Sequence, residues 1–162
     1  MISQTTEYAL RAVVFLAQHP EDSWTTQQIA EATKVPAGYL SKVLQGLRKA
    51  GLVTSQRGRH GGFQLGHPPY SVSVLQIVNA VEPIRRIHQC PLEIGSHGAA
   101  LCPLHRKLDE TIATVEQSFQ QTTLADLLGR PGTNEPLCEF PYGSGQEPRS
   151  RLRGKPAEEE AE

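Results

Sequence analysis

Apolar residues recur at helical spacing in three segments of the first fifty residues. The first segment, residues 4–18, ends before Pro20, because proline cannot continue a helix. The second is predicted to begin at Thr25, whose hydroxyl pairs with Gln28 in the pattern of a capping box, and to end near Thr33. After the connector 34–36, a third helix is predicted to end at Gly51, and its buried face consists of Leu40, Val43, Leu44 and Leu47.

A short hairpin is predicted directly after these helices. Residues 52–55 and 63–65 have the character of two strands, and the glycine-rich stretch 57–62 between them favours a tight turn. Two helices joined by about four residues and followed by a hairpin form a winged helix-turn-helix, in which the second helix enters the major groove of DNA. We therefore expect a mainly α fold with a small β-hairpin wing, and a winged helix-turn-helix domain over residues 1–82.

The second half of the chain is predicted to contain a short helix and a long one. The short helix begins at Ser73, which forms a second capping box with Gln76. The long helix runs from about residue 103 to 121 and carries a narrow apolar seam, Leu108, Ile112, Val115 and Phe119. Such a seam is typical of helix pairing and predicts a homodimer, although packing against its own domain is the alternative. The predicted regions are a sensor loop at 83–102, a dimerisation helix region at 103–128 and a disordered tail at 129–162.

Charge is unevenly distributed along the chain. The formal net charge is only -1, yet no acidic residue occurs between Glu31 and Glu82, where six lysines and arginines lie. A segment of this kind attracts the phosphates of nucleic acid, whereas an ordinary solvated face mixes both signs. The alternative is a basic surface that serves solubility alone. Arg57 and Arg59 at the tip of the hairpin are expected to reach phosphates or the minor groove.

The apolar stretch 9–17 is interrupted by Arg11, is too short to span a bilayer and is not followed by a cleavage site, so the protein is expected in the cytoplasm. Its three cysteines, Cys90, Cys102 and Cys138, are too few for a secreted disulfide framework. They indicate free thiols or metal ligands. Cys138 lies in the predicted tail and is interpreted as an incidental thiol.

The stretch 90–105 holds the most reactive side chains. Pro103 suits the first position of a helix, so Cys102 would occupy the cap, where backbone amides favour its thiolate. His105 follows three residues later in the first turn, and Cys90 can fold back across the intervening loop. Two cysteines and one histidine are an incomplete set for zinc or for an iron-sulfur cluster. A further ligand would come from Glu93, Ser96, His97 or elsewhere.

Over about residues 1–128 the chain resembles the winged-helix regulators that include the iron-sulfur cluster regulator (IscR), the nitric-oxide-sensitive repressor (NsrR) and the cysteine-metabolism repressor (CymR). The resemblance rests on residues 39–53, on the wing glycines, and on Glu7-Tyr8-Ala9-Leu10-Arg11-Ala12. Cluster-binding members carry three cysteines, and the iron-sulfur cluster regulator adds a histidine three residues after the last. Cys90, Cys102 and His105 match this pattern, whereas Ser96 stands at the middle position.

The resemblance implies a homodimeric repressor of a double-stranded DNA operator. It implies a [2Fe-2S] cluster held by Cys90, Cys102 and His105, with Glu7 of the other subunit as the further metal ligand. By resemblance and position, the residues expected to contact DNA are Thr26, Gln27, Ala37, Gly38, Tyr39, Ser41, Lys42, Gln45, Arg57, Gly58, Arg59 and His60.

Other interpretations stay open at this point. The regulator could lack a cluster and respond to a small ligand, to thiol chemistry or to a partner protein, or its cysteines could bind zinc. An enzyme could use Cys102 as nucleophile and His105 as base. The winged domain could instead be an adaptor that binds protein, which the acid-free basic segment argues against.

Overall fold

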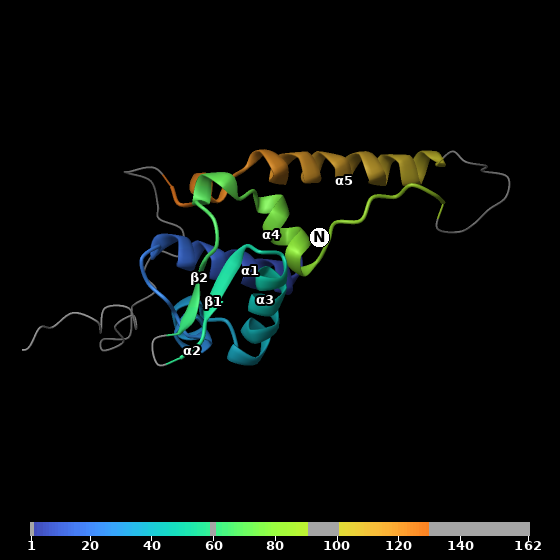
Figure 1. Cartoon of the computed structure of the whole chain (residues 1–162). Helices are drawn as coiled ribbons and strands as arrows, with labels where there is room; N and C mark the ends of the chain where they lie inside the picture. The colour runs from blue at the N-terminus through green and yellow to red at the C-terminus, as the bar shows by residue number, and fades with distance from the viewer. Residues whose placement is uncertain (1, 59–60, 91–100, 130–162) are drawn as a thin grey trace, which may run out of the picture.

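The N-terminal helix α1 (Gln4–Gln18) forms the centre of the core. The computed structural model describes residues 2–58, 61–90 and 101–129. Ser3 caps α1, its side chain accepting a hydrogen bond from the backbone N–H of Thr6, and the apolar stripe predicted for residues 4–18 is buried except for Leu10, which is half-buried. Helices α2, α3 and α4 all pack against α1 (Figure 1).

The predicted helix-turn-helix is confirmed as α2 (Thr26–Thr33) and α3 (Ala37–Lys49). The capping box between Thr25 and Gln28 is present, and the four apolar residues predicted for the third helix are buried. Lys34 ends α2 in the left-handed conformation with φ 56°, and Gly51 takes φ 78° after α3. A residue in the left-handed conformation ends each helix. Glycine adopts this conformation at a low cost in free energy, and lysine at a higher one.

The wing is an antiparallel pair of strands, β1 (Val53–Gln56) and β2 (Gly62–Leu65), with Val53 opposite Leu65 and Gln56 opposite Gly62. A pairing that the sequence did not predict anchors it. The backbone N–H of Trp24 donates to Phe63 O at 3.0 Å, and the N–H of Phe63 donates to Trp24 O at 2.7 Å. The fully buried indole of Trp24 thus lies beside the wing and ties the hairpin to the segment before α2.

Gly62 makes that pairing possible. A Cβ atom added at Gly62 would lie 2.7 Å from the backbone N and O of Trp24, which is closer than real side chains approach. The sequence suggested that the wing glycines serve a tight turn. For Gly62 the structure gives another reason, because the glycine admits a neighbouring segment of its own chain.

After the 3₁₀ helix η1 (Pro69–Ser71), α4 (Val74–Val81) begins at the predicted capping box of Ser73 and Gln76. The long helix α5 (Pro103–Gln121) has the predicted bounds. The short helix α6 (Leu124–Leu127) follows and buries Leu124 completely against the core. The N–H of Leu124 donates to Val72 O at 2.7 Å. This docking was not predicted from the sequence.

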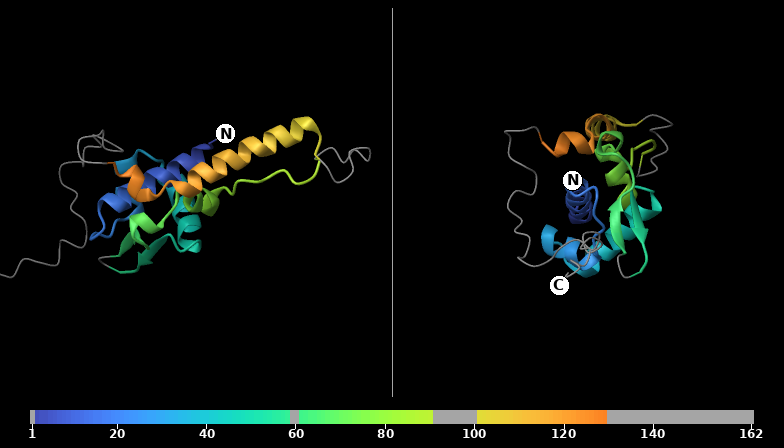
Figure 2. Two further views of the ribbon diagram at one scale, coloured as in Figure 1. Left: turned by 90° about the horizontal axis from the view of Figure 1, so that it is seen from above. Right: turned by 60° about the vertical axis from the view of Figure 1, so that its left-hand side comes forward.

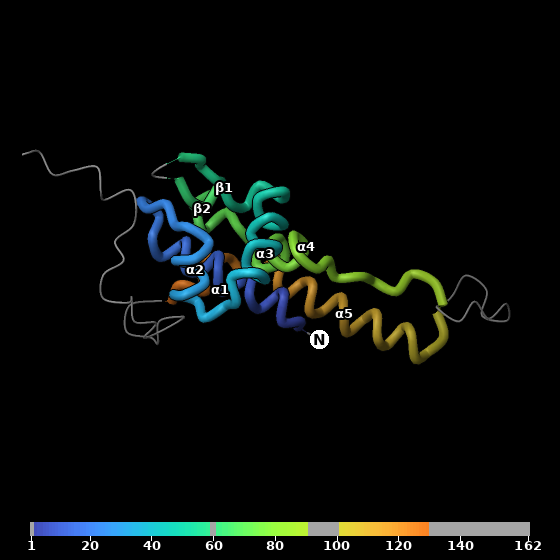
Figure 3. Tube along the Cα trace, turned by 90° about the horizontal axis from the view of Figure 1, so that it is seen from below, coloured from blue at the N-terminus to red at the C-terminus, as the bar shows by residue number. Residues whose placement is uncertain are grey.

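The fold is mainly helical, a winged helix-turn-helix with a two-stranded hairpin and a long C-terminal helix, as predicted. Helix α5 lies across the side of the molecule opposite α2 and the wing, and its N-terminal end projects past the other helices (Figures 1 and 2). Seen from below, α3 and the wing form the near layer and α5 extends behind them (Figure 3). Within the described ranges, no helix combines the length and apolar content needed to cross a membrane. The predicted tail lies outside the described residues from residue 130 onward.

Candidate DNA interface and sensor site

Helix α3 presents a polar face to solvent. Its apolar residues face α1, so the positions between them point outward, and Gly38, Tyr39, Ser41, Lys42 and Gln45 are all exposed. Ala37 at the start of the helix is half-buried. A side chain added at Gly38 would meet nothing within 4 Å, which leaves the first turn of α3 open to close approach. These are the positions expected to read base edges in a helix-turn-helix.

Tyr39 is the most prominent side chain of this face. It is 57% exposed, and its ring packs edge-on against Tyr8 of α1, with ring centroids 6.2 Å apart. Arg11, one turn further along α1, donates from Nη1 to the carbonyl of Thr33 at 3.3 Å, at the C-terminal end of α2. A positive charge is stabilising at this end of a helix, where the helix dipole is negative. Through these two contacts α1 holds both helices of the helix-turn-helix, a role that the sequence did not reveal.

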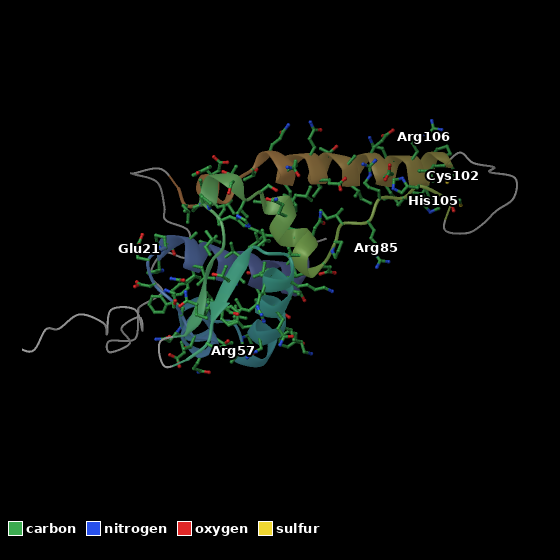
Figure 4. The ribbon with its side chains drawn as sticks, viewed as in Figure 1. Glu21, Arg57, Arg85, Cys102, His105 and Arg106 are labelled. Carbon is green, nitrogen blue, oxygen red and sulfur yellow. The ribbon has the colours of Figure 1, made fainter. Side chains whose placement is uncertain are left out.

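The remaining predicted DNA contacts lie at the start of α2 and in the wing. Thr26 is half-buried, and Gln27 is exposed and donates from Nε2 to Glu31 at 3.0 Å. Arg57 and Gly58 are exposed at the end of the hairpin, where Gly58 adopts φ 108°. Arg59 and His60 lie outside the described residues. Arg57 lies on the opposite side of the molecule from α5 (Figure 4).

Two thiols and one imidazole meet at the projecting end of α5, where Figure 4 labels Cys102 and His105. Cys102 is the N-cap of α5, with Pro103 following, as the sequence suggested, but its side chain makes no hydrogen bond to the backbone amides of the first turn. Its Sγ lies 3.3 Å from Nδ1 of His105, and Sγ of Cys90 lies 3.8 Å from the same nitrogen. All three residues are half-buried. The structure therefore brings together three of the four predicted metal ligands.

These distances fit a shared metal only in part. Sulfur at about 2.3 Å and nitrogen at about 2.1 Å from a tetrahedral metal lie about 3.6 Å apart, close to both observed separations. Among the described residues, however, no group of three or more His, Cys, Asp or Glu side chains is arranged to hold a metal ion. The three side chains are thus a partial donor set. Glu93, Ser96 and His97 belong to the stretch 91–100, outside the described residues.

The fourth predicted ligand, Glu7, is not brought to the thiols within one chain. It lies in the first turn of α1 and forms an ion pair with Arg11. The helix that carries it packs in the winged domain, whereas Cys102 and His105 lie where α5 projects away from that domain (Figure 4). A contribution from Glu7 to this site requires a second chain.

A second polar cluster lies one turn further along α5. Arg86 donates from Nε and Nη2 to the two carboxylate oxygens of Asp109, at 2.7 and 2.6 Å, and its Nη1 lies 3.5 Å from Glu116. Asp109 also accepts the backbone N–H of Ile87 at 2.9 Å. The hydrogen bonds from Arg86 and Ile87 lower the pKa of Asp109 to about 2, and the bond to Asp109 raises the pKa of Arg86. We call Arg86, Asp109 and Glu116 the arginine clamp; the sequence analysis missed it.

Comparisons with known proteins agree with this architecture. Residues 2–130 match the model of the Rrf2 family, described as an iron-dependent transcriptional regulator. The chain is similar to the solved structure of T. potens IscR, with 29% identity, a TM-score of 0.65, and coverage of 79% of this chain and 85% of that one. It is also similar to CymR, the global cysteine regulator of B. subtilis, with 31% identity, a TM-score of 0.64, and coverage of 78% and 95%.

The oxidized form of Staphylococcus aureus CymR is a third similar structure, with 27% identity, a TM-score of 0.64, and coverage of 82% of this chain and 99% of that one. The family match spans most of the chain, and the fold, the exposed recognition helix and the basic wing agree with it. The enzyme interpretation of Cys102 and His105 is excluded, because family members regulate transcription. The chain belongs to the Rrf2 family and is a DNA-binding transcriptional regulator, not an enzyme.

Proposed function

We propose that this regulator is a homodimeric repressor whose affinity for its operator follows the state of an iron-sulfur cluster bound by Cys90, Cys102 and His105. The observation that carries the proposal is the convergence of two thiols on one imidazole at the projecting end of α5. Soft thiolates with imidazole suit iron-sulfur clusters and zinc. The similarity to IscR and to a family of iron-dependent regulators favours iron.

The exposure of α5 supports the proposed dimer. No residue of this helix is buried, and Leu104 and Leu108 are 64% and 47% exposed. Beside the helix lies a mainly apolar groove of about 540 Å³, whose walls come from α5, the end of α4 and the start of α1, and include Ile112, Val115 and Phe119. A second copy of α5 would cover these apolar surfaces. Two recognition helices would then read half-sites roughly 34 to 36 Å apart.

The same dimer would complete the donor set. Glu7 in the first turn of α1 is half exposed, with 51% of its side chain accessible, and it ion-pairs only with its own neighbour Arg11 among the contacts described. In our proposal Glu7 of one chain leaves Arg11 to serve as the fourth ligand at the thiols of the other. The bound cluster would supply a redox-active centre. What the chain supplies is a fixed spacing of Cys90, Cys102 and His105 and a link from them to α5.

Anaerobic purification followed by a visible absorption spectrum and by iron and sulfide analysis tests the cluster. We expect a coloured protein whose colour is lost in Cys102→Ser and retained in the matched variant Cys138→Ser, which removes a thiol outside the proposed site. A colourless, iron-free protein that still binds DNA would contradict the cluster and leave the regulator intact. Sedimentation equilibrium at the same concentrations tests the dimer.

One observation favours a second candidate, a cluster-free regulator switched by thiol chemistry. Ser96 replaces the middle cysteine of the cluster-binding pattern, while Cys90 and Cys102 still share His105. The chain is also similar to CymR, which has been solved in an oxidized form. This candidate predicts that metal-free protein binds operator DNA tightly when reduced and weakly after oxidation, or the reverse. The cluster proposal predicts no such change in metal-free Cys138→Ser protein.

A further inference from the structure

The segment 83–90 connects α4 to the thiols without forming a helix or a strand. The N–H of Ile84 donates to Asn79 Oδ1 at its beginning, and Arg86 and Ile87 bond to Asp109 in its middle. Cys90 follows four residues after Arg86. A segment without regular structure holds a side chain in place only through such anchors, so the position of Cys90 depends on what Arg86 binds.

Asp109 and Glu116 are seven residues apart on α5, and therefore lie on the same face of the helix about two turns apart. Arg86 reaches both. From Asp109 the helix runs back about 10 Å to Cys102, since each residue rises 1.5 Å. The four residues from Arg86 to Cys90 span at most about 13 to 14 Å when extended. The segment and the helix thus run antiparallel for a matching length and end at the same place, as Figure 4 shows for α5 and the chain beneath it.

We infer that the arginine clamp is the device that positions Cys90 against Cys102 and His105, and that Arg86 is a positioning residue of the sensor site. The bidentate pair with Asp109 fixes the direction of the segment as well as its distance from the helix, which a single contact would not do. Arg86 and Asp109 are 32% and 16% exposed, so the pair is partly shielded from solvent. The regulatory meaning of the clamp rests on the proposed function, whereas its geometric effect does not.

Cobalt(II) binding to the metal-free, full-length Cys138→Ser protein tests the inference. Cobalt bound by thiolates gives a sulfur-to-metal charge-transfer band, so its titration reports how well Cys90 and Cys102 are placed. Loss of residues that orient metal ligands costs about 10- to 100-fold in affinity. We expect Arg86→Gln to weaken cobalt binding by about tenfold or more, with a weaker band per bound metal, and Arg86→Lys to restore part of the loss.

The sign of this effect separates positioning from electrostatics. Removing a positive charge near a cation site should strengthen cation binding, so a loss in Arg86→Gln would oppose the charge effect. Arg85→Gln is the matched control, because it removes the same charge from an exposed neighbour outside the clamp. We expect Arg85→Gln to bind cobalt as well as the unaltered protein or slightly better. Asp109→Asn should weaken binding, and the double variant with Arg86→Gln should lose far less than the sum.

Equal cobalt affinity in Arg86→Gln and Arg85→Gln would overturn the inference, and so would additive effects of Arg86→Gln and Asp109→Asn. Absence of a charge-transfer band in the unaltered protein would overturn it as well. Circular dichroism and the unfolding midpoint establish that each variant is folded. If Arg86→Gln does not fold, the test rests on Arg86→Lys. The cluster is judged separately, by colour and iron content, so a clamp that works in a protein without a cluster would still be recognised.

Discussion

Gly62→Ala should detach the wing from the body of the domain. The added Cβ would lie 2.7 Å from the backbone N and O of Trp24, and an ordinary contact needs about 0.7 Å more. Both partners are backbone, so neither can turn aside as a flexible side chain would. A shift of this size would lengthen the two bonds between Trp24 and Phe63, now 3.0 and 2.7 Å, to the limit of hydrogen bonding or beyond it.

Each backbone hydrogen bond contributes about 0.5 to 1.5 kcal/mol net, so the loss of two predicts a drop of about 1 to 3 kcal/mol in the free energy of unfolding. Urea titration followed by the fluorescence of Trp24, the single tryptophan of the chain, measures that drop. Hydrogen exchange at the Trp24 and Phe63 amides should accelerate in the same variant. Operator affinity should also fall, because Arg57 would no longer be held at a fixed place.

Gly38→Ala is the matched control, because a Cβ at Gly38 meets nothing within 4 Å and the residue lies within α3. Alanine is favoured over glycine in a helix by up to about 1 kcal/mol, so the free energy of unfolding should rise or stay unchanged. If Gly62→Ala is within about 0.5 kcal/mol of the unaltered protein, the size of an ordinary surface substitution, the reasoning is refuted. Unchanged exchange at both amides would refute it independently.

Three further predictions concern other parts of the molecule. Arg57→Ala should reduce the slope of log affinity against log salt by about one unit without changing stability; an unchanged slope in salt titrations of operator binding would contradict a phosphate contact. Leu124→Ala should lower the free energy of unfolding by about 2 to 5 kcal/mol in urea titrations, because the side chain is fully buried, and a loss below 1 kcal/mol would mean that α6 is not docked in solution. The lowered pKa of Asp109, about 2 against 3.8, means that its bond to Arg86 stabilises the fold above pH 4 and that this contribution is lost as the pH falls from 4 towards 2. Asp109→Asn should therefore flatten acid unfolding in that window, and Glu110→Gln, which removes an exposed carboxylate from the same helix, should not.

Local signals in the sequence predicted most of the fold. Helices α2 and α4 begin at Thr25 and Ser73, where a hydroxyl and a glutamine three residues later satisfy each other's amides, and such boxes are readable from four residues. The start of α5 at Pro103 and the stop after α3 at Gly51 follow from the fixed φ of proline and from the left-handed freedom of glycine.

The features that were missed depend on residues far apart in the chain. Trp24 and Phe63 are joined by backbone bonds, whose only trace in the sequence is Gly62, a glycine that a tight turn explains equally well. Arg86 and Asp109 are separated by 23 positions and look like two ordinary surface charges. Only α6 left a usable signal: Thr123 and Asp126 form a capping box, but four helical residues are too few to show a period.

The sequence predicted which residues meet at the candidate site, but not whether they form a complete set of metal ligands. The order of Cys102, Pro103 and His105 predicts that a cysteine occupies the N-cap position and that an imidazole lies in the first turn, and the structure agrees, although the thiol itself makes no capping hydrogen bond. The contact between Cys90 and the same imidazole depends on the arginine clamp. Glu7 cannot be placed at the thiols by any argument within one chain, because its helix belongs to the winged domain.

The positions of the two sites limit how a signal at the thiols could reach DNA. Helix α5 packs on α4, and α4 packs on α3, so the route within one chain passes through two helix contacts before it reaches the recognition helix. Packed helices move as rigid bodies between discrete arrangements more readily than they deform. Helix α5 has no buried residue, whereas α3 is held in the core by four buried residues. Helix α5 is therefore the element that can shift at the least cost in free energy. In the proposed dimer, a change at Cys102 is therefore expected to alter how the two DNA-binding domains are held relative to each other, and hence the spacing of the two recognition helices, more than the shape of either domain.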